Sequence, residues 1–339
     1  MDLRQKIGQM FMIGFTGTEP GCIAEELITE MHLGGVILFR PNCQSTEQLK
    51  TLLKSLQDCT ASNGRTDRLL VSIDQEGGPW IILGAHICPA FPTNWEHGQS
   101  FRHTGDVEPV RRQAKATAKV HRDLGINMNL APVVDVVTHS GNEVISTRAF
   151  GDNTETVSKL GAEYINVLQD AGVIATAKHF PGHGPTDIDS HKALPTVHME
   201  RSEIDGVHLP PFIAAIKAGT DAVMTAHMVY SSVSDTPATL CKTWLTDELR
   251  GNLGFEGVII TDDMNMLAIA DNFTRAEAAV AAVNAGVDIV LVCANPEIQR
   301  EMYAAVLSAA ESGAISAARI DESVGRILAM KKKYGLLDS

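Results

Sequence analysis

Short apolar runs recur along the chain, each followed by a polar or Gly/Pro-rich break and usually by a segment with amphipathic helical spacing. Runs that are apolar throughout suit strands buried on both faces of a sheet. The eight runs are Met10–Phe15, Gly35–Phe39, Leu69–Asp74, Met128–Val134, Ile174–His179, Ala222–His227, Gly257–Asp262 and Asp288–Cys293. The clearest helical patterns are Thr46–Cys59, Val110–Leu124, Thr154–Asp170, Arg275–Ala285 and Pro296–Ser312. Eight strand–helix repeats are the number found in a (β/α)8 barrel, although a doubly wound open sheet also alternates.

Polar residues at the ends of these runs favour the barrel. Such residues stand at or just past the carboxyl ends of different runs, namely Asp74, Lys178 with His179, His227 and Asp262. A closed ring of strands gathers them on one face, whereas an open sheet spreads them along an edge. No linker rich in Pro, Gly or Ser divides the chain. We therefore predict an α/β protein with a single (β/α)8 TIM-type barrel domain spanning residues 1–339.

Composition excludes several classes of protein. Hydrophobic residues make up 44% of the chain and charged residues 20%, which is typical of a globular protein with a sizeable core. The net charge of −13 argues against nucleic acid and anionic membranes as partners. The apolar run at residues 7–15 is too short and too glycine-interrupted to span a bilayer, and no signal-peptide cleavage site follows it. The six cysteines are scattered without CxxC spacing, so we expect reduced thiols and a cytoplasmic protein.

The stretch from Lys178 to His191 has the highest density of reactive side chains. It reads KHFPGHGPTDIDSH, with three histidines, a lysine and two aspartates, and it begins where an apolar run ends. Barrel enzymes and doubly wound enzymes build their active sites in loops at the carboxyl ends of strands. The stretch is therefore the first candidate for an active-site loop.

Two further segments place carboxylates at the ends of predicted strands. Asp262 and Asp263 end one run, and because side-chain direction alternates along a strand, only one of the two is expected to enter the barrel mouth. That aspartate could be a nucleophile, and Asp263 could instead cap a helix. Asp74 precedes a Gly77-Gly78 turn that would allow close approach of the backbone to a ligand. Its carboxylate could accept paired hydrogen bonds from vicinal sugar hydroxyls, or it could cap a turn.

Together these segments resemble glycoside hydrolase family 3, specifically its β-N-acetylhexosaminidase branch. The resemblance runs in order over nearly the whole chain and is specific as a combination. It rests on DQEGG at residues 74–78, NLAPVVD at 129–135, RAFG at 148–151, KHFPGHG with DSH at 178–191, and TDDM at 261–264. It implies a (β/α)8 barrel that removes terminal β-linked N-acetylglucosamine with retention of configuration.

The resemblance also implies roles for individual residues. It makes Asp262 the nucleophile of a glycosyl-enzyme intermediate and His191 the general acid/base, oriented by Asp189. Retaining glycosidases ordinarily use two carboxylates. A histidine can nevertheless protonate the leaving oxygen and then deprotonate water, because imidazole titrates near neutral pH. By the same matching, sugar hydroxyls are bound by Asp74, Arg148, Lys178 and His179. We expect His183 to be structural, and His227 either lines the site or supports the core.

The chain departs from the family pattern at one place. After the glycine pair the family commonly continues with R-V-x-R-L, which contributes a substrate contact, whereas this chain continues with PWIILG at residues 79–84. No arginine is present there. The departure bears on contacts with the leaving group and not on the hydrolytic residues. Trp80 could offer an aromatic face to a sugar or pack in the core.

Three alternatives remain at this stage. A metal-dependent barrel hydrolase or aldolase would use His179, His183, His191 and Asp262 as ligands, but Pro181 and Gly182 keep the first two histidines from sharing a helical face. A β-N-acetylglucosaminide phosphorylase would use the same site, because a histidine repels phosphate less than a carboxylate does. A non-catalytic sugar-binding protein would not need the two aspartates and the histidine together.

The physiological role is implied only by the resemblance. Single-domain cytoplasmic members of this branch release N-acetylglucosamine in peptidoglycan recycling, so the expected partner is a small carbohydrate, an N-acetylglucosaminide or a muropeptide. We expect no metal and no organic cofactor, because the nucleophile and the acid/base suffice. We expect the protein to be a monomer or a weak homo-oligomer.

Overall fold

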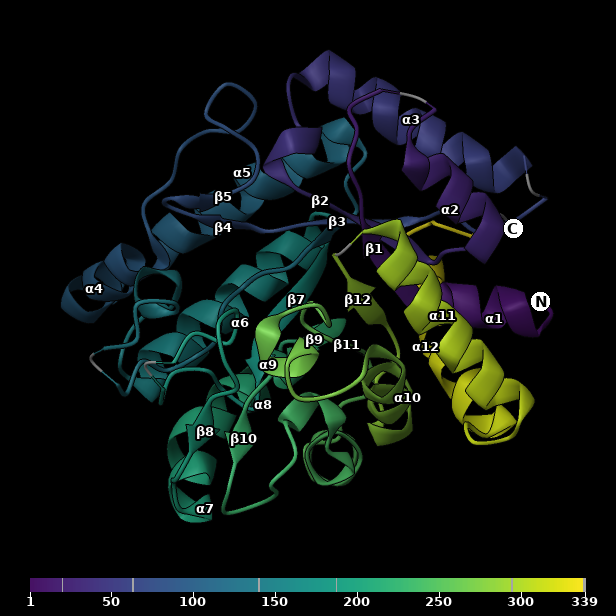
Figure 1. Ribbon diagram of the computed structural model, residues 1–339. Coiled ribbons are helices and arrows are strands. Elements are labelled where there is room, and N and C mark those ends of the chain that lie inside the picture. Colours follow the sequence, from purple (N-terminus) through teal and green to yellow (C-terminus); the bar gives the residue numbers. More distant parts are fainter. Residues whose placement is uncertain (20, 63, 140, 187, 294, 338–339) are drawn as a thin grey trace.

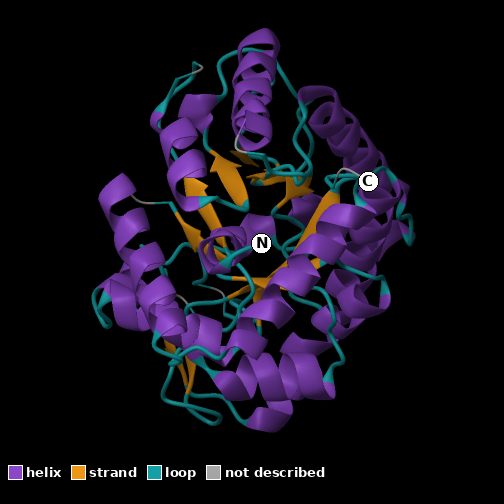
Figure 2. Ribbon diagram, turned by 90° about the vertical axis from the view of Figure 1, so that its right-hand side faces the viewer, coloured by secondary structure: helices purple, strands orange, loops and turns teal. Residues whose placement is uncertain are grey.

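A ring of parallel strands forms the centre of the molecule, and helices surround it (Figures 1 and 2). The computed structural model describes residues 1–339 except 20, 63, 140, 187, 294 and 338–339. Within these residues the main sheet has eight strands in the order β11-β9-β7-β6-β3-β2-β1-β12. A parallel bridge between Ile260 and Ile289 joins the two edges of the sheet and closes the ring. The predicted (β/α)8 TIM-type barrel is thereby confirmed.

Each predicted apolar run contains one strand of the barrel. The strands are β1 (Phe11–Gly14), β2 (Gly35–Leu38), β3 (Leu70–Ile73), β6 (Met128–Asn129), β7 (Ile174–Phe180), β9 (Ala222–Thr225), β11 (Val258–Ile260) and β12 (Val290–Val292). Every residue of these strands is buried, as expected for strands that face the barrel interior on one side and helices on the other. The run from Met128 to Val134 yields the shortest strand. Its ladder with β7 stops after Asn129 and resumes at the bridge between Val133 and Lys178.

The longer helices follow the predicted amphipathic segments. They are α3 (Thr46–Ser62), α5 (Glu108–Leu124), α6 (Thr154–Asp170), α10 (Arg275–Ala285), α11 (Pro296–Glu311) and α12 (Ala317–Lys333). Side chains at their starts explain several boundaries: Asn153 accepts the Thr156 amide before α6, and Thr274 and Glu277 form a reciprocal capping box at α10. Gly125, with a φ of 92°, ends α5 in a conformation that glycine adopts readily.

Shorter elements decorate the barrel. The shorter α-helices are α1 (Leu3–Gln9), α2 (Ile23–Met31), α4 (Asn94–Thr104), α7 (Arg201–Glu203), α8 (Leu209–Lys217) and α9 (Leu267–Ala270). The remaining helical turns are η1 (Arg40–Asn42), η2 (Ser146–Arg148), η3 (Ile204–His208), η4 (Ala238–Leu240) and η5 (Thr243–Asn252). Two small sheets, β4 (Gln75–Gly77) with β5 (Trp80–Ile81) and β8 (Thr196–Val197) with β10 (Val229–Tyr230), lie outside the barrel ring. In the described part of the chain, no helix has both the length and the apolar character needed to cross a membrane.

Strand β7 contains a register shift close to Lys178 and His179. Lys178 pairs with Met224 of β9, but the next pair joins Phe180 to Thr225, so an extra residue of β7 lies between the two pairs. A bulge of this kind re-aims the side chains around it. The irregularity lies within the strand, between Lys178 and Phe180 and before Pro181.

Candidate active site

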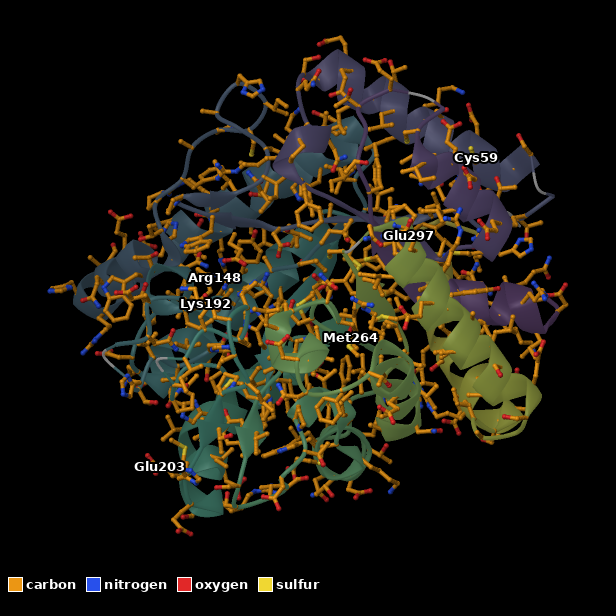
Figure 3. All side chains as sticks on the ribbon, in the orientation of Figure 1. Cys59, Arg148, Lys192, Glu203, Met264 and Glu297 are labelled. Atoms are coloured by element: carbon orange, nitrogen blue, oxygen red, sulfur yellow. The ribbon has the colours of Figure 1, made fainter. Side chains whose placement is uncertain are left out.

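A cavity of about 610 Å³ opens at the carboxyl ends of the barrel strands. Asp74 follows β3, Asp262 follows β11, and Lys178 and His179 lie in the last part of β7. Six of the predicted site residues line this cavity, namely Asp74, Arg148, Lys178, His179, His191 and Asp262. Figure 3 labels Arg148, Lys192 and Met264, which come from loops that follow three different strands, β6, β7 and β11. The structure therefore brings residues far apart in sequence to one end of the barrel.

Volume alone does not single out this cavity. A hollow of about 550 Å³ lies near the amino ends of the strands, where Asp67 and Arg68 precede β3 and Gly125 precedes β6. Barrel enzymes carry their chemistry at the carboxyl ends of the strands, and residues at the opposite end serve stability. Position and the kind of side chain thus identify the candidate active site.

Two cations and two carboxylates form the floor of the cavity. The Lys178 ammonium lies 2.5 Å from Asp74 Oδ1 and 2.7 Å from Glu76 Oε1. Arg148 donates two hydrogen bonds to Glu76, from Nε to Oε2 and from Nη2 to Oε1, both of 2.8 Å. Bidentate pairing of this kind fixes the guanidinium in one orientation. Lys178 and Glu76 are almost fully buried, with 1% and 3% exposed, whereas the Asp74 side chain is 33% exposed and can meet a ligand.

Mutual pairing keeps these groups charged. Burial disfavours the charged form of Glu76, but Arg148 and Lys178 outweigh it and lower the pKa of this carboxyl. Burial likewise opposes the charge of Lys178, yet Asp74 and Glu76 raise the pKa of its ammonium. The pKa of Arg148 is raised against the effect of burial by the neighbouring Glu76. The floor therefore offers fixed charges and oriented N–H groups, which suit a ligand rich in hydroxyls.

Glu76 was quoted in the sequence motif but received no role. Its signal was the alternation Asp74-Gln75-Glu76, which sends the two carboxylates to the same side of an extended chain. Its partners, Arg148 and Lys178, are distant in sequence, and no local pattern connects them.

His179 is oriented from behind by Asp135. The buried Asp135 carboxylate lies 2.7 Å from His179 Nδ1 and also accepts the main-chain N–H of His183 at 2.6 Å. Burial opposes ionisation of Asp135, but His179 and His183 lower the pKa of this carboxyl. With Nδ1 bound to a carboxylate, Nε2 is the ring nitrogen left for a ligand in the cavity. Asp135 is a second residue that sequence reasoning quoted without assigning it a function.

The paired aspartates after β11 have different environments. Asp262 Oδ1 accepts the Asp263 amide at 2.8 Å. Burial opposes the charge of Asp262, but nearby His179 and His227 and this amide lower the pKa of its carboxyl to about 2. Asp263 Oδ1 accepts the amides of Asn265 and Cys293, at 3.1 and 2.8 Å, and burial raises its pKa. Asp263 thus caps a turn and does not cap a helix, since α9 begins after Met266. Of the two adjacent aspartates, Asp262 is therefore the one that stays ionised at the cavity.

His227 supports this turn from the interior. Its Nδ1 lies 2.8 Å from Thr239 Oγ1 and its Nε2 lies 3.0 Å from the Asp263 carbonyl oxygen. The residue is buried, and burial lowers its pKa. Of the two roles that the sequence left open, the structure supports core support and positioning of the turn that carries Asp262.

Asp189 and His191 form a hydrogen-bonded pair at the rim of the cavity. Asp189 Oδ1 lies 2.8 Å from His191 Nδ1 and accepts the His191 amide at 2.9 Å. Burial opposes ionisation of Asp189, but these hydrogen bonds lower the pKa of its carboxyl. The His191 side chain is 61% exposed, whereas that of Asp189 is 20% exposed. Asp189 therefore lies behind the ring and leaves His191 at the open end of the cavity, where it lines the wall.

The loop that carries this pair is anchored at two places. Tyr230 donates its hydroxyl to the Gly182 carbonyl, and His183 Nε2 lies 3.0 Å from Ser190 Oγ. The Ser190 carbonyl accepts the Ala268 amide at 3.2 Å. Burial lowers the pKa of His183 to about 4, so this ring stays neutral and structural, as expected. Asp187, which belongs to the same stretch, lies outside the described residues.

The β4–β5 hairpin forms one side of the cavity mouth. Gly77 and Gly78 both have positive φ, at 122° and 55°. A Cβ on Gly78 would lie 2.5 Å from Thr93 Cγ2, and one on Gly77 would lie 2.6 Å from Gln113 Nε2. The glycines therefore permit a tight turn against other protein groups, and close approach of this backbone to a ligand stays a prediction. Trp80 does not pack in the core, because it is 40% exposed and lines the cavity.

The metal-site hypothesis finds no support in the geometry. Across residues 1–339, apart from those left undescribed, no group of three His, Cys, Asp or Glu side chains is placed to hold a metal ion. His183 is turned toward Ser190 and His179 toward Asp135, so these two histidines do not converge on one point. Asp262 instead interacts with histidines and a main-chain amide.

A closed parallel barrel with carboxylates, cations and histidines around a cavity at its carboxyl end defines an enzyme of the barrel class. Sequence comparison then gives the family. A model described as the glycosyl hydrolase family 3 N terminal domain matches residues 2–330. β-Hexosaminidase A of Pseudoalteromonas piscicida is 36% identical over 327 residues, which are 91% of this chain and 54% of that protein. A β-hexosaminidase of Thioalkalivibrio sulfidiphilus is 36% identical over 319 residues, which are 93% of this chain and 88% of that protein.

Solved structures give the same result. A glycoside hydrolase family 3 β-N-acetylglucosaminidase from Paenibacillus sp. str. FPU-7 has a TM-score of 0.95 and 44% identity, covering 99% of this chain and 63% of that one. A β-N-acetylhexosaminidase from Beutenbergia cavernae has a TM-score of 0.90 and 32% identity, covering 98% and 99%. The chain thus spans about half the length of the Pseudoalteromonas protein and nearly the whole length of the Beutenbergia protein. It belongs to glycosyl hydrolase family 3, falls among its β-hexosaminidases and is a glycoside hydrolase.

Proposed function

We propose that the protein is a retaining exo-β-N-acetylglucosaminidase that works through a covalent glycosyl-Asp262 intermediate, with His191 as general acid/base and Asp189 as its orienting partner. The observation that carries the proposal is an ionised carboxylate, that of Asp262, at the cavity together with a hydrogen-bonded His–Asp pair at the rim of the same cavity. A nucleophile must be ionised and a general acid must reach the leaving group. Asp262 meets the first requirement and His191 meets the second.

In the first step, an Asp262 oxygen attacks the anomeric carbon while the bond to the leaving oxygen breaks. His191 gives its Nε2 proton to that oxygen, and Asp189 stabilises the ring through Nδ1. In the second step, His191 takes a proton from water, the water oxygen attacks the anomeric carbon, and Asp262 leaves as a carboxylate. Two displacements on opposite faces of the sugar restore the β configuration.

The low pKa of Asp262 serves both steps. The charge interactions with His179 and His227 and the hydrogen bond from the Asp263 amide stabilise the carboxylate, which keeps the nucleophile ionised and makes it a good leaving group. The same interactions weaken its basicity. The compensating driving force must come from proton transfer by His191 and from positioning of the sugar.

We infer that the floor binds the terminal sugar. Asp74, Arg148, Lys178 and His179 line the cavity, and the first three form one ion-pair network with Glu76. A network tied together in this way holds its N–H and carboxylate groups in place before the sugar arrives, which lowers the entropic cost of binding. The closed floor also explains why only a terminal sugar would fit.

The N-acetyl group and the physiological role rest on relatedness. The relatives are named β-hexosaminidases, and the Paenibacillus protein is named a β-N-acetylglucosaminidase. We extend that specificity to this chain and infer that muropeptides of peptidoglycan recycling are its substrates in the cytoplasm, in line with the resemblance to single-domain members of the branch.

Steady-state hydrolysis of an aryl β-N-acetylglucosaminide by the wild type, Asp262→Ala and His191→Ala, with chelator present throughout, tests the proposal. We expect an active wild type, losses of several orders of magnitude for Asp262→Ala, and a loss for His191→Ala that shrinks as the leaving group becomes more acidic. Added phosphate should not stimulate the wild type. Phosphate stimulation with a glycosyl phosphate product would make the protein a phosphorylase, and loss of activity in chelator would return the metal hypothesis.

A further inference from the structure

Trp80 is an exposed aromatic residue at the cavity mouth. It lies at the start of β5, is 40% exposed and lines the cavity beside Pro79 and Ile81. Exposed tryptophan surface is unfavourable in water unless a ligand or partner covers it. Trp80 belongs neither to the ion-pair network of the floor nor to the His191–Asp189 pair.

Polar contacts fix the ring in its exposed position. Trp80 Nε1 donates to Thr147 Oγ1 at 3.1 Å, and the Arg148 guanidinium carbon lies 5.1 Å from the ring centroid. The guanidinium covers one face, so the exposed area is left to the opposite face and the edge of the ring. An aromatic side chain held in place without burial is prepared to stack on a ligand.

Arg40 fixes the backbone on both sides of the ring. Its Nη2 donates to the Pro79 carbonyl at 3.1 Å, and its Nε donates to the Ile81 carbonyl at 2.9 Å. Arg40 follows β2 and also lines the cavity. It joins two loops of the barrel mouth and thereby holds the hairpin that carries Trp80.

The position of Trp80 relative to the floor indicates which part of a bound substrate would contact its ring. The closed end of the cavity contains Lys178 and Glu76, which are 1% and 3% exposed, whereas Trp80 and His191 lie at the open end. In an exo-acting enzyme the terminal sugar fills the closed end, so the leaving group extends toward the open end. His191, the proposed proton donor, must also be on the leaving-group side.

We propose that Trp80 is an aromatic platform for the leaving group, and that it favours substrates whose leaving group is itself a ring, such as a second pyranose. This inference rests on the proposed function. A pyranose presents apolar C–H groups on its faces, and stacking them on an aromatic face removes apolar surface from water on both partners.

The test compares two substrates that share the terminal sugar. In N,N′-diacetylchitobiose the leaving group is a pyranose, whereas in methyl β-N-acetylglucosaminide it has no ring. Trp80→Ala should lower kcat/KM for the disaccharide about tenfold and leave that for the methyl glycoside within about twofold. Trp80→Phe, which keeps a ring, should retain most of the disaccharide activity. Thr147→Val removes only the hydrogen bond to Trp80 Nε1. It should lower kcat/KM for the disaccharide less than Trp80→Ala does, and it should leave kcat/KM for the methyl glycoside unchanged.

Two results would overturn the platform. Equal losses on both substrates would show that Trp80 acts through Arg148 and the floor, and unchanged disaccharide activity in Trp80→Ala would show that it makes no contact. If the wild type hydrolyses neither substrate, the proposed function fails. A binding measurement then tests separately whether Trp80 contacts the second sugar. Titration with the disaccharide should change the tryptophan fluorescence of the wild type more than titration with N-acetylglucosamine does, and Trp80→Phe should abolish that difference. Identical fluorescence changes in wild type and Trp80→Phe would refute the platform.

Discussion

The Asp189 carboxylate binds His191 through two groups at once, the ring Nδ1 at 2.8 Å and the main-chain N–H at 2.9 Å. One oxygen atom, Oδ1, makes both contacts. Asp189 therefore fixes the backbone turn and the ring together, and the ring cannot rotate about χ1 without losing one of its two ties to the carboxylate.

Asp189→Ala should reduce kcat/KM for glycosides with poor leaving groups about a hundredfold, because the histidine loses its orientation and the support of its charged form. The loss should be much smaller for an activated aryl leaving group, which needs little protonation. Lys192→Ala is a matched control, since Lys192 lies 3.6 Å from the same carboxylate and is 82% exposed. If Asp189→Ala and Lys192→Ala have the same rates with a poor leaving group, Asp189 is not the orienting partner.

Glu76→Gln should destabilise the protein by about 3–5 kcal/mol, because it leaves the buried Lys178 and Arg148 cations without half of their counter-charge. Urea unfolding at neutral pH measures the effect, and KM should rise in parallel as the floor loosens. Asp58→Asn is the control, because it breaks an exposed ion pair with Lys54 at the surface and should leave stability unchanged. A Glu76→Gln protein as stable as the wild type would contradict the floor network.

The pH dependence of the His191→Ala variant isolates the nucleophile. With an activated aryl substrate, the first step in this variant needs only the ionised Asp262 carboxylate. The pKa of Asp262 is lowered to about 2, so kcat/KM should be flat between pH 5 and pH 8. The same profile measured on the wild type gives the contribution of the general acid. An acidic limb in His191→Ala with a midpoint above pH 5 would mean that Asp262 is not the group that must be ionised.

Buried histidines predict how stability changes with pH. Burial lowers the pKa of His121 from 6.5 to about 4. Between these values the unfolded chain binds a proton that the folded protein does not, so the free energy of unfolding falls as the pH drops from 7 to 5. The loss is at most about 2 kcal/mol for this residue. His121→Leu should lose less stability over the same range, which urea titrations at the two pH values can measure. Equal losses in His121→Leu and wild type would contradict a neutral buried His121.

The barrel could be predicted because its signal is local and repeated. Strands buried on both faces appear as continuous apolar runs, and each predicted run contains a strand. Helix α6 begins and ends as predicted, since its cap at Asn153 and its amphipathic pattern agree. The run at Met128 was predicted too long as a strand, because its apolar pattern continues past Asn129, where the regular ladder with β7 stops. That residues 1–339 form a single domain stays a prediction.

The site was harder to predict because its contacts join distant segments. The placement of Asp74, Lys178, His179 and Asp262 at strand ends was enough to bring them to one cavity. Their partners were missed, because the sequence showed only that Glu76 alternates with Asp74 and nothing in it connected Asp135 to His179. Trp80 illustrates the limit, since exposure and the contact with Arg148 depend on how two loops meet.

The most direct measurement is covalent trapping of the intermediate. A fluorinated N-acetylglucosaminyl fluoride slows both chemical steps, but its good leaving group preserves the first, so a glycosyl-enzyme should accumulate. The anomeric fluoride leaves and the ring fluorine stays, so peptide mass spectrometry should find one fluoro-N-acetylglucosaminyl adduct, on Asp262, and none in Asp262→Asn. An adduct on another residue, or labelling of Asp262→Asn to the same extent as the wild type, would contradict Asp262 as the nucleophile.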